Sequence, residues 1–214
     1  MVIRHPGISL LRRRAALLAG VCVLIGGCSL TENPYESQTV SGDEAIGLID
    51  SMRPAGSYEN ARRRLNDTAA AIADRIVAAV PDQTWQFSDD PHGQQITAAG
   101  LPCEKLTGDI ARRPLADAVV FGRTFSADEF ATAGEIMRDE AAAFGATDGS
   151  SLFNEQTKRD VAVQGNGYEF ELGQIDTATL NITGECFLLQ SVVDLPPGQL
   201  PPEPPIVSPT TTTS

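Results

Sequence analysis

The sequence predicts an α+β fold: a single domain in which a mostly antiparallel sheet has helices packed on one face. Three observations lead to this prediction. Apolar residues recur at helical spacing in the first two thirds of the chain, alternating strand patterns fill the last third, and tight turns join successive strands. The 214 residues, 42% apolar and 21% charged, have the composition of one folded domain.

Residues 1–27 have the pattern of a secretory signal. Four arginines precede an apolar run that is shorter than the roughly 20 residues of a membrane span. The run ends at Ile25–Cys28 (IGGC), the order of a bacterial lipobox, so we expect Cys28 to be diacylated and to anchor the protein in the cell membrane, on its extracytoplasmic face. An incidental cysteine after a plain signal peptide, or a short buried helix, is the alternative.

The charge balance narrows the function classes. The chain has 16 basic and 28 acidic residues, a net charge of −12, and loss of residues 1–27 removes four arginines, which leaves 12 − 28 = −16. This acidity argues against nucleic-acid binding and against electrostatic docking on anionic lipid. We therefore predict an acidic body that is joined to its anchor by a polar tether over residues 28–40.

Two helices are predicted at the start of the body. The first, over residues 41–56, begins at a capping box formed by Ser41 and Glu44. The second, over residues 57–80, has Ser57 as its N-cap and a continuous stripe of apolar residues at helical spacing. A proline directly after each of these stripes supports the predicted ends.

Short strands are predicted in the middle of the chain. The alternation over 83–88 is typical of a half-buried strand, residues 89–93 (DDPHG) predict a turn, and residues 94–99 predict a second strand. A further apolar strand is expected over 118–125.

A third helix is the most clearly marked element. Ser126 and Glu129 match a second capping box, and Phe125 and Phe130 are placed as a hydrophobic staple around it. Gly145 stands where a left-handed residue would end the helix.

The last third of the sequence predicts further strands, followed by a segment of different composition. Asn166-Gly167 is a strong two-residue hairpin signal, and strands are expected over 177–183 and 185–193. The predicted domain thus spans 41–194. Residues 195–214, rich in proline and threonine, cannot form a packed core and are expected to be a loose end, with a partner-binding segment or a glycosylated stalk as alternatives.

Two further cysteines, Cys103 and Cys186, remain in the mature chain. An even pair in an oxidising compartment predicts one disulfide, which chain-entropy arguments value at roughly 4–5 kcal/mol as an upper figure. Two buried thiols or a metal site are the alternatives, although two cysteines alone leave a zinc ion short of ligands.

Few residues carry catalytic or ligand chemistry. Asp89, Asp90 and His92 form the one local cluster with metal-ligand character, and a turn built from turn-forming residues is the favoured interpretation, so no metal and no cofactor are expected. Nucleophilic hydrolysis has only His92 as a base beyond residue 27. A carboxylate pair for glycoside hydrolysis stays open, because 28 acids offer many pairs.

Several stretches of the sequence match a known pattern. The stretches are 48–65, 83–91, 109–122, 125–130, 151–155, 163–174 (VQGNGYEFELGQ) and 177–190 (TATLNITGECFLLQ), followed by LPPGQLPPEPPI. With these stretches the chain resembles the LppA-like lipoproteins of mycobacteria. The resemblance implies a cell-envelope lipoprotein without an established activity, with Cys28 as its lipid anchor and Cys103 and Cys186 as its disulfide pair. It implies no catalytic residue.

These observations favour a binding or accessory domain, lipid-anchored in the envelope, over an enzyme. Its expected ligand is a lipid or glycolipid held between helices and sheet, or an envelope protein, and not a nucleic acid. The alternatives are a carboxylate-dependent enzyme acting on envelope glycans, and an interaction module that uses residues 195–214 to capture a partner protein.

Overall fold

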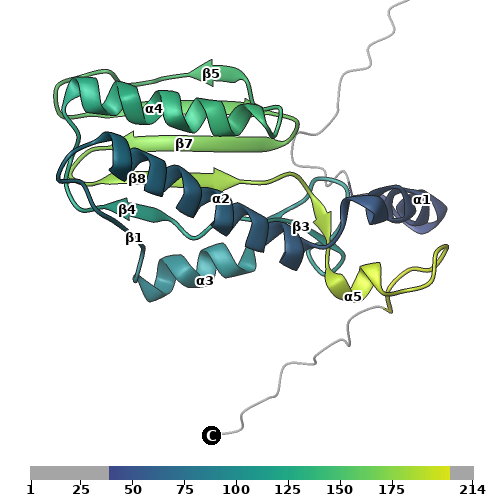
Figure 1. Ribbon diagram of the computed structural model, residues 1–214. Coiled ribbons are helices and arrows are strands. Elements are labelled where there is room, and N and C mark those ends of the chain that lie inside the picture. Colours follow the sequence, from purple (N-terminus) through teal and green to yellow (C-terminus); the bar gives the residue numbers. More distant parts are fainter. Residues whose placement is uncertain (1–38, 203–214) are drawn as a thin grey trace, which may run out of the picture. The chain divides into compact units, whose positions relative to one another are not determined.

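The computed structural model describes residues 39–202 (Figure 1). The helices are α1 Gly42–Met52, the 3-10 turn Arg53–Ala55, α2 Tyr58–Ala79, α3 Pro91–Ala99, α4 Ala127–Ala142 and α5 Gln190–Val193. The strands are β1 Trp85–Phe87, β2 Leu101–Pro102, β3 Ala111–Arg113, β4 Val119–Phe121, β5 Asp148–Ser150, β6 Arg159–Gly165, β7 Tyr168–Gln174, β8 Ala178–Thr183 and β9 Phe187–Leu188. None of these helices is both long and apolar enough to cross a bilayer.

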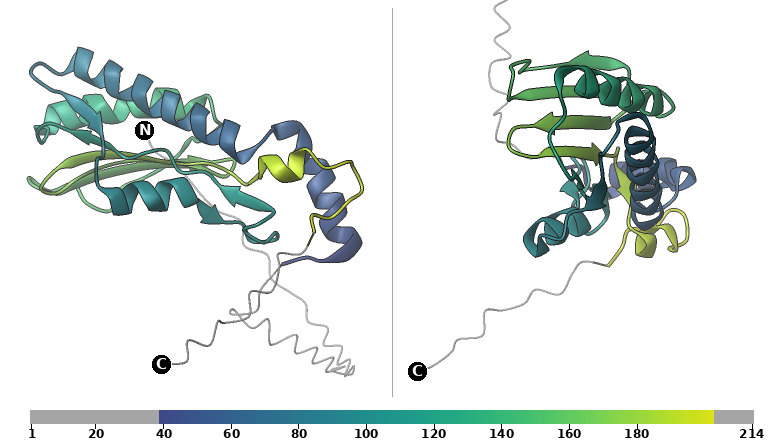
Figure 2. Two further views of the ribbon diagram at one scale, coloured as in Figure 1. Left: turned by 90° about the horizontal axis from the view of Figure 1, so that it is seen from below. Right: turned by 60° about the vertical axis from the view of Figure 1, so that its left-hand side comes forward.

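The main sheet has six strands in the order β1-β4-β8-β7-β6-β5, and all of its pairings are antiparallel. Helices α2 and α4 lie side by side over one face, where apolar residues such as Phe170, Leu180 and Met137 are fully buried (Figures 1 and 2). The opposite face presents exposed polar residues such as Glu171 and Asn181. The predicted α+β class, with an antiparallel sheet and helices on one face, is confirmed.

Local signals positioned α2 and α4 correctly. The Ser57 hydroxyl accepts a hydrogen bond from the Asn60 amide at the start of α2. Both halves of the capping box are present at α4, where Ser126 accepts from the Glu129 amide and Glu129 accepts from the Ser126 amide. The tight end of this helix is formed by Gly145, whose φ is +73°.

The hairpin between β6 and β7 turns at the predicted pair. Asn166 and Gly167 have φ values of 49° and 80°, the left-handed backbone that a two-residue hairpin of this kind requires. Gly167 is also needed for space, because a Cβ there would lie 2.8 Å from the Cβ of Glu185. The turn therefore sets the register of the longest strand pair.

A smaller sheet, β2-β3-β9, packs with α1 around a second apolar cluster. Ile49 of α1, Ala111 of β3 and Leu188 of β9 are fully buried in it. Helix α3 lies next to the β1 edge of the main sheet in Figure 1, and its last turn contacts α2, since the Tyr58 hydroxyl donates to the Ala98 carbonyl at 2.9 Å.

Four expectations were wrong in detail. Residues 94–99 belong to helix α3 instead of a strand, and residues 91–93 of the expected turn form the start of the same helix, because Asp90 accepts from two backbone amides and Pro91 starts the helix with a suitable φ. Ser41 occupies the N-cap of α1 without a side-chain capping bond. The strand expected over 185–193 is short, because β9 leaves the main sheet to pair with β3 and the chain then turns into α5.

The first residues of the proline-rich segment are held against α1. The Arg53 guanidinium donates to the carbonyls of Val193 and Leu195, both at 2.8 Å, and the Asp50 carboxylate accepts from the Gly198 amide at 3.0 Å. The start of this segment is therefore attached to the body. Residues 203–214 lie outside the described residues.

Candidate functional site

Cys103 and Cys186 form a disulfide bond, with their Cα atoms 6.0 Å apart. The bond joins the residue after β2 to the residue before β9, the two strands that flank β3 in the small sheet. The disulfide therefore links the two edge strands of the small sheet covalently. Cys28, the expected lipidation site, lies outside the described residues.

Of Asp89, Asp90 and His92, Asp90 has a structural use. The Asp90 carboxylate accepts hydrogen bonds from the amides of His92 and Gly93, the latter at 2.8 Å, and so caps α3. Within residues 39–202 there is no group of three histidine, cysteine or acidic residues placed to hold a metal ion. The structure thus uses the carboxylate of Asp90 to start a helix.

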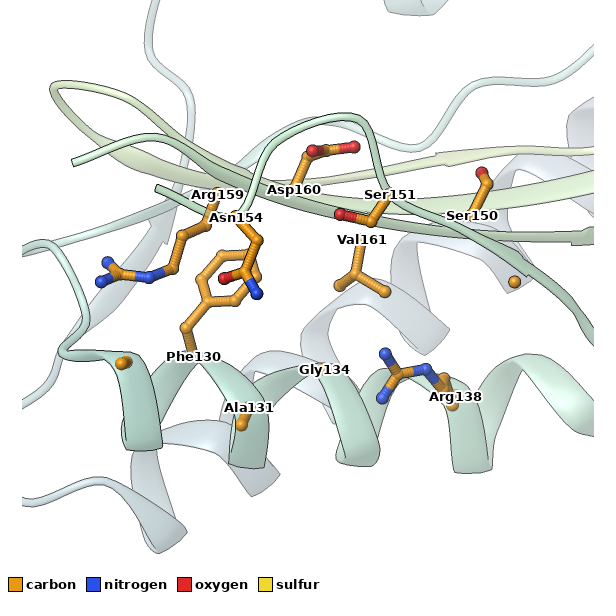
Figure 3. A pocket seen from close by; sticks show the side chains of 12 residues that line it. Phe130, Ala131, Gly134, Arg138, Ser150, Ser151, Asn154, Arg159, Asp160 and Val161 are labelled. Carbon is orange, nitrogen blue, oxygen red and sulfur yellow. The ribbon is translucent and has the colours of Figure 1, made fainter. Parts of the chain in front are cut away.

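A cleft of about 650 Å³ opens between α4 and the start of β6, beside the loop 151–158 that joins β5 to β6 (Figure 3). The side chains of Phe130 and Val161 supply apolar surface within it, and Ala131 and Gly134 line the wall formed by α4. The packing at Gly134 is close, because a Cβ there would lie 3.3 Å from Val161 Cγ1. The cleft is thus apolar where the helix and the strand meet.

Two arginines face the cleft, Arg138 from α4 and Arg159 from β6 (Figure 3). Within residues 39–202, neither guanidinium group donates a hydrogen bond or forms an ion pair. All other arginines in this part of the chain contact an acid, an amide or carbonyl oxygen, or an aromatic ring: Arg53, Arg62, Arg63, Arg64, Arg75, Arg112, Arg113 and Arg123. The two guanidinium groups without a partner in the described chain therefore line the same cleft.

Asp160 is the one acid among the residues that line the cleft, and its carboxylate is already engaged. It accepts from the backbone amides of Leu152, at 3.0 Å, and Phe153. Figure 3 shows the carboxylate on the side of the loop, away from Arg138. Asp160 therefore shapes the loop 151–158 and leaves the positive charge of the two arginines uncompensated.

The rim of the cleft at the start of α4 is fixed by an ion pair. The Arg123 guanidinium donates to both carboxylate oxygens of Glu129, at 2.8 and 3.0 Å. This contact, together with the amide of Ser126, lowers the pKa of Glu129 to about 2. The first turn of α4, which carries Phe130, is held in place by charged groups that stay paired at neutral pH.

A second cavity, of about 470 Å³, lies beside the disulfide, between α1 and the β6–β7 hairpin. Its arginine, Arg113, donates to the carbonyls of Gly184 at 2.9 Å and Gly167 at 3.1 Å. Next to this hairpin, burial and the neighbouring Glu185 raise the pKa of Tyr168 to about 12. The Arg113 donors are used for backbone contacts, and the two basic residues of the lining, Arg113 and Lys105, are matched by two acids, Glu104 and Glu185, so this cavity lacks the net positive charge of the first.

Comparison with known proteins places the chain in a family. The family model described as "Lipoprotein confined to pathogenic Mycobacterium" matches residues 32–190. The chain belongs to the LppA family.

Similar proteins share most of the LppA-family chain. LppA of Mycobacterium tuberculosis is 63% identical over 190 residues, which cover 89% of this chain and 86% of that protein. LppB of the same species is 62% identical with the same coverage. The crystal structure of M. tuberculosis LppA has a TM-score of 0.73 and 65% identity, over 74% of this chain and 94% of the solved chain.

The arginine-lined cleft of this LppA-family protein was not predicted from its sequence. Arg138 lies on a helix that was predicted, but the strand that begins at Arg159 was not assigned. One local signal was present in the loop 151–158, where Leu152 and Phe153 stand among polar residues just before Lys158 and Arg159. A pair of large apolar residues in a loop is a reason to look for a binding surface.

Proposed function

We propose that this LppA-family protein is a membrane-anchored lipoprotein of the cell envelope, held on the extracytoplasmic face by acyl chains on Cys28. The family description and the lipobox at residues 25–28 support this proposal. A Cys28→Ala variant should move from the membrane fraction to the soluble fraction on ultracentrifugation. Retention of the variant in the membrane fraction would contradict it.

The proposed activity of this anchored protein is to bind an anionic ligand in the cleft between α4 and β6. The observation that carries it is the pair Arg138 and Arg159, which have no partner within residues 39–202 in a chain of net charge −12. Guanidinium groups recognise carboxylates and phosphates through paired hydrogen bonds, and a cation in a partly apolar cleft gains most from such a partner. The cleft volume also falls in the range of small-molecule sites.

Calorimetric titration with glycerol phosphate tests the proposed site. Replacement of Arg138 or Arg159 by alanine should weaken binding about tenfold or more, since each loses hydrogen bonds to a charged group worth roughly 1.5–3 kcal/mol. Because neither side chain has a partner in the described chain, the thermal midpoint should change little.

The matched control is Arg75→Ala. Arg75 forms a surface ion pair with Glu140, between α2 and α4 and outside the cleft. Its replacement should leave the affinity for glycerol phosphate unchanged. Equal losses in all three variants would indicate a general charge effect, and the absence of any binding would refute the site.

A further inference from the structure

Exposed apolar residues lie on two segments that border the cleft, the loop between Ser151 and Asn154 and the end of β7. Leu152 is 83% exposed and Phe153 is 48% exposed, both in the loop 151–158, and Ile175, at the end of β7, is 61% exposed. The last residue of β7, Gln174, is paired with Arg159 across the sheet. The three most exposed large apolar residues of the described chain thus lie on the two segments whose backbones flank Arg159.

Hydrogen bonds order the backbone of the loop that carries Leu152 and Phe153. Besides the contacts of the Asp160 carboxylate, the Asp160 amide donates to the Phe153 carbonyl at 3.1 Å, and the Glu155 amide donates to the Lys158 carbonyl at 2.8 Å. A surface that is ordered before binding loses less conformational entropy when a ligand arrives. The exposed pair is therefore built into the turn at the edge of the cleft.

Basic residues lie next to this apolar surface, together with two exposed acids, Glu155 in the loop and Asp176 after Ile175. Lys158 and Arg159 follow the loop directly, and Arg138 faces it from α4. A ligand that satisfies both features carries an anionic group at one end and a hydrocarbon chain at the other. We propose that the ligand of the cleft is a single anionic amphiphile, with its charged headgroup in the cleft between Arg138 and Arg159 and its hydrocarbon chain over Leu152, Phe153 and Ile175.

This inference rests on the proposed anion site and adds the class of ligand. A single bound molecule fits the net negative charge of the body better than a bilayer surface does, because the acidic body is repelled by an anionic membrane.

The position of the cleft also favours a single bound molecule over a contact with the bilayer. Helix α2, whose 22 residues span about 33 Å, begins beside β9 and ends near the start of α4, where Arg123 donates to the Pro81 carbonyl.

The segment from the anchor enters at the other end of the body. The Val40 amide donates to the Lys105 carbonyl at 3.0 Å, next to α1, and Figure 1 places α1 at the end of the body opposite to the start of α4. The cleft, which begins at the start of α4, thus lies toward the end of the body that is remote from Val40.

The test compares two probes that share a phosphate group. Dihexanoyl phosphatidylglycerol, used below its micelle concentration, and glycerol phosphate are titrated calorimetrically into the chain carrying Cys28→Ser, so that no acyl chain of its own competes. The lipid should bind at least about tenfold more tightly, because burial of two methylene groups accounts for a factor of that size. The variant Leu152→Ser/Phe153→Ser should lose this advantage and keep its affinity for glycerol phosphate.

The control variant is Ile96→Ser/Leu101→Ser, which changes two exposed apolar residues, 47% and 37% exposed, on α3 and β2. It should behave as the parent chain. Two results would contradict the amphiphile proposal without contradicting the anion site. One is equal affinity for both probes, and the other is a higher affinity for the lipid that persists in the Leu152→Ser/Phe153→Ser variant. Binding of neither probe would overturn both. Sedimentation with phosphatidylglycerol vesicles without binding of the short lipid would identify a bilayer contact and also overturn the inference.

Discussion

At the scale of single residues, the contrast among the arginines is informative. Arg53 uses its guanidinium to hold backbone carbonyls, and Arg123 pairs with Glu129, so both stabilise the fold directly. Arg138 and Arg159 do neither within the described chain. In a protein with an excess of acids, an unpaired guanidinium in a cleft is available for a ligand.

Glu129 should make the stability of the protein depend on pH in the acid range. Its pKa is lowered to about 2 in the folded state, below the value of about 4.3 in an unfolded chain, so its ionised form stabilises the fold above that value and the contribution is lost as the pH falls toward 2. Thermal unfolding at several pH values checks this. The parent chain should melt above Glu129→Gln at pH 5–7, and the difference should shrink toward pH 2.

The control is Glu135→Gln, on the same helix. The Glu135 carboxylate forms no ion pair and accepts no hydrogen bond within residues 39–202. Its variant should follow the parent chain at every pH. A difference between the parent and Glu129→Gln that stayed constant down to pH 2 would speak against the pair with Arg123.

At the scale of elements, α3 shows how a capping residue outweighs a weak alternation. The sequence of residues 94–99 fits a strand about as well as a helix, and none of the residues of α3 is buried enough to decide. Asp90 and Pro91 decide it, because the carboxylate satisfies two free amides and the proline ring presets the first helical φ.

Loss of the Asp90 cap should therefore destabilise the protein. We expect Asp90→Ala to lower the free energy of unfolding by about 1 kcal/mol, measured by urea denaturation at constant slope. Asp89→Ala is the matched control, since the Asp89 carboxylate accepts no hydrogen bond within the described chain, and it should stay within about 0.5 kcal/mol of the parent. Equal effects of the two variants would show that the cap contributes nothing.

At the scale of the whole molecule, the two larger apolar clusters of the described chain share one body. The larger lies between the main sheet and the pair α2 and α4, and the smaller lies between α1 and the small sheet. The disulfide of Cys103 and Cys186 spans 83 positions in sequence and closes the small sheet. It restricts the unfolded chain far more than it adds contacts to the folded one.

Removal of this disulfide should lower stability by up to about 4–5 kcal/mol, the value that loop-closure entropy gives for a loop of this length. Guanidinium denaturation of the parent chain with and without reductant measures the loss. The double variant Cys103→Ala/Cys186→Ala should unfold at the lower midpoint and be insensitive to reductant. An unchanged midpoint for the parent in reductant would mean that the bond adds no stability.

The sequence alone determined the features that depend on neighbours a few positions away. The capping box of Ser126 and Glu129 and the hairpin of Asn166 and Gly167 were found, because the groups that interact lie within one turn of chain. The α+β class followed from the periodicity of apolar residues, since period and burial are linked.

Only the tertiary structure decided the site. Arg138 and Arg159 line one cleft because α4 packs on β6, and their charge stays open because Asp160 is turned into its own loop. Periodicity shows which face of an element is buried. It does not show which charged side chains of two elements line the same cleft, or whether an acidic side chain forms an ion pair with them. Which charges form ion pairs across the chain depends on the packed molecule. Here Arg138 and Arg159 stay without a partner in the described chain and are available for a ligand.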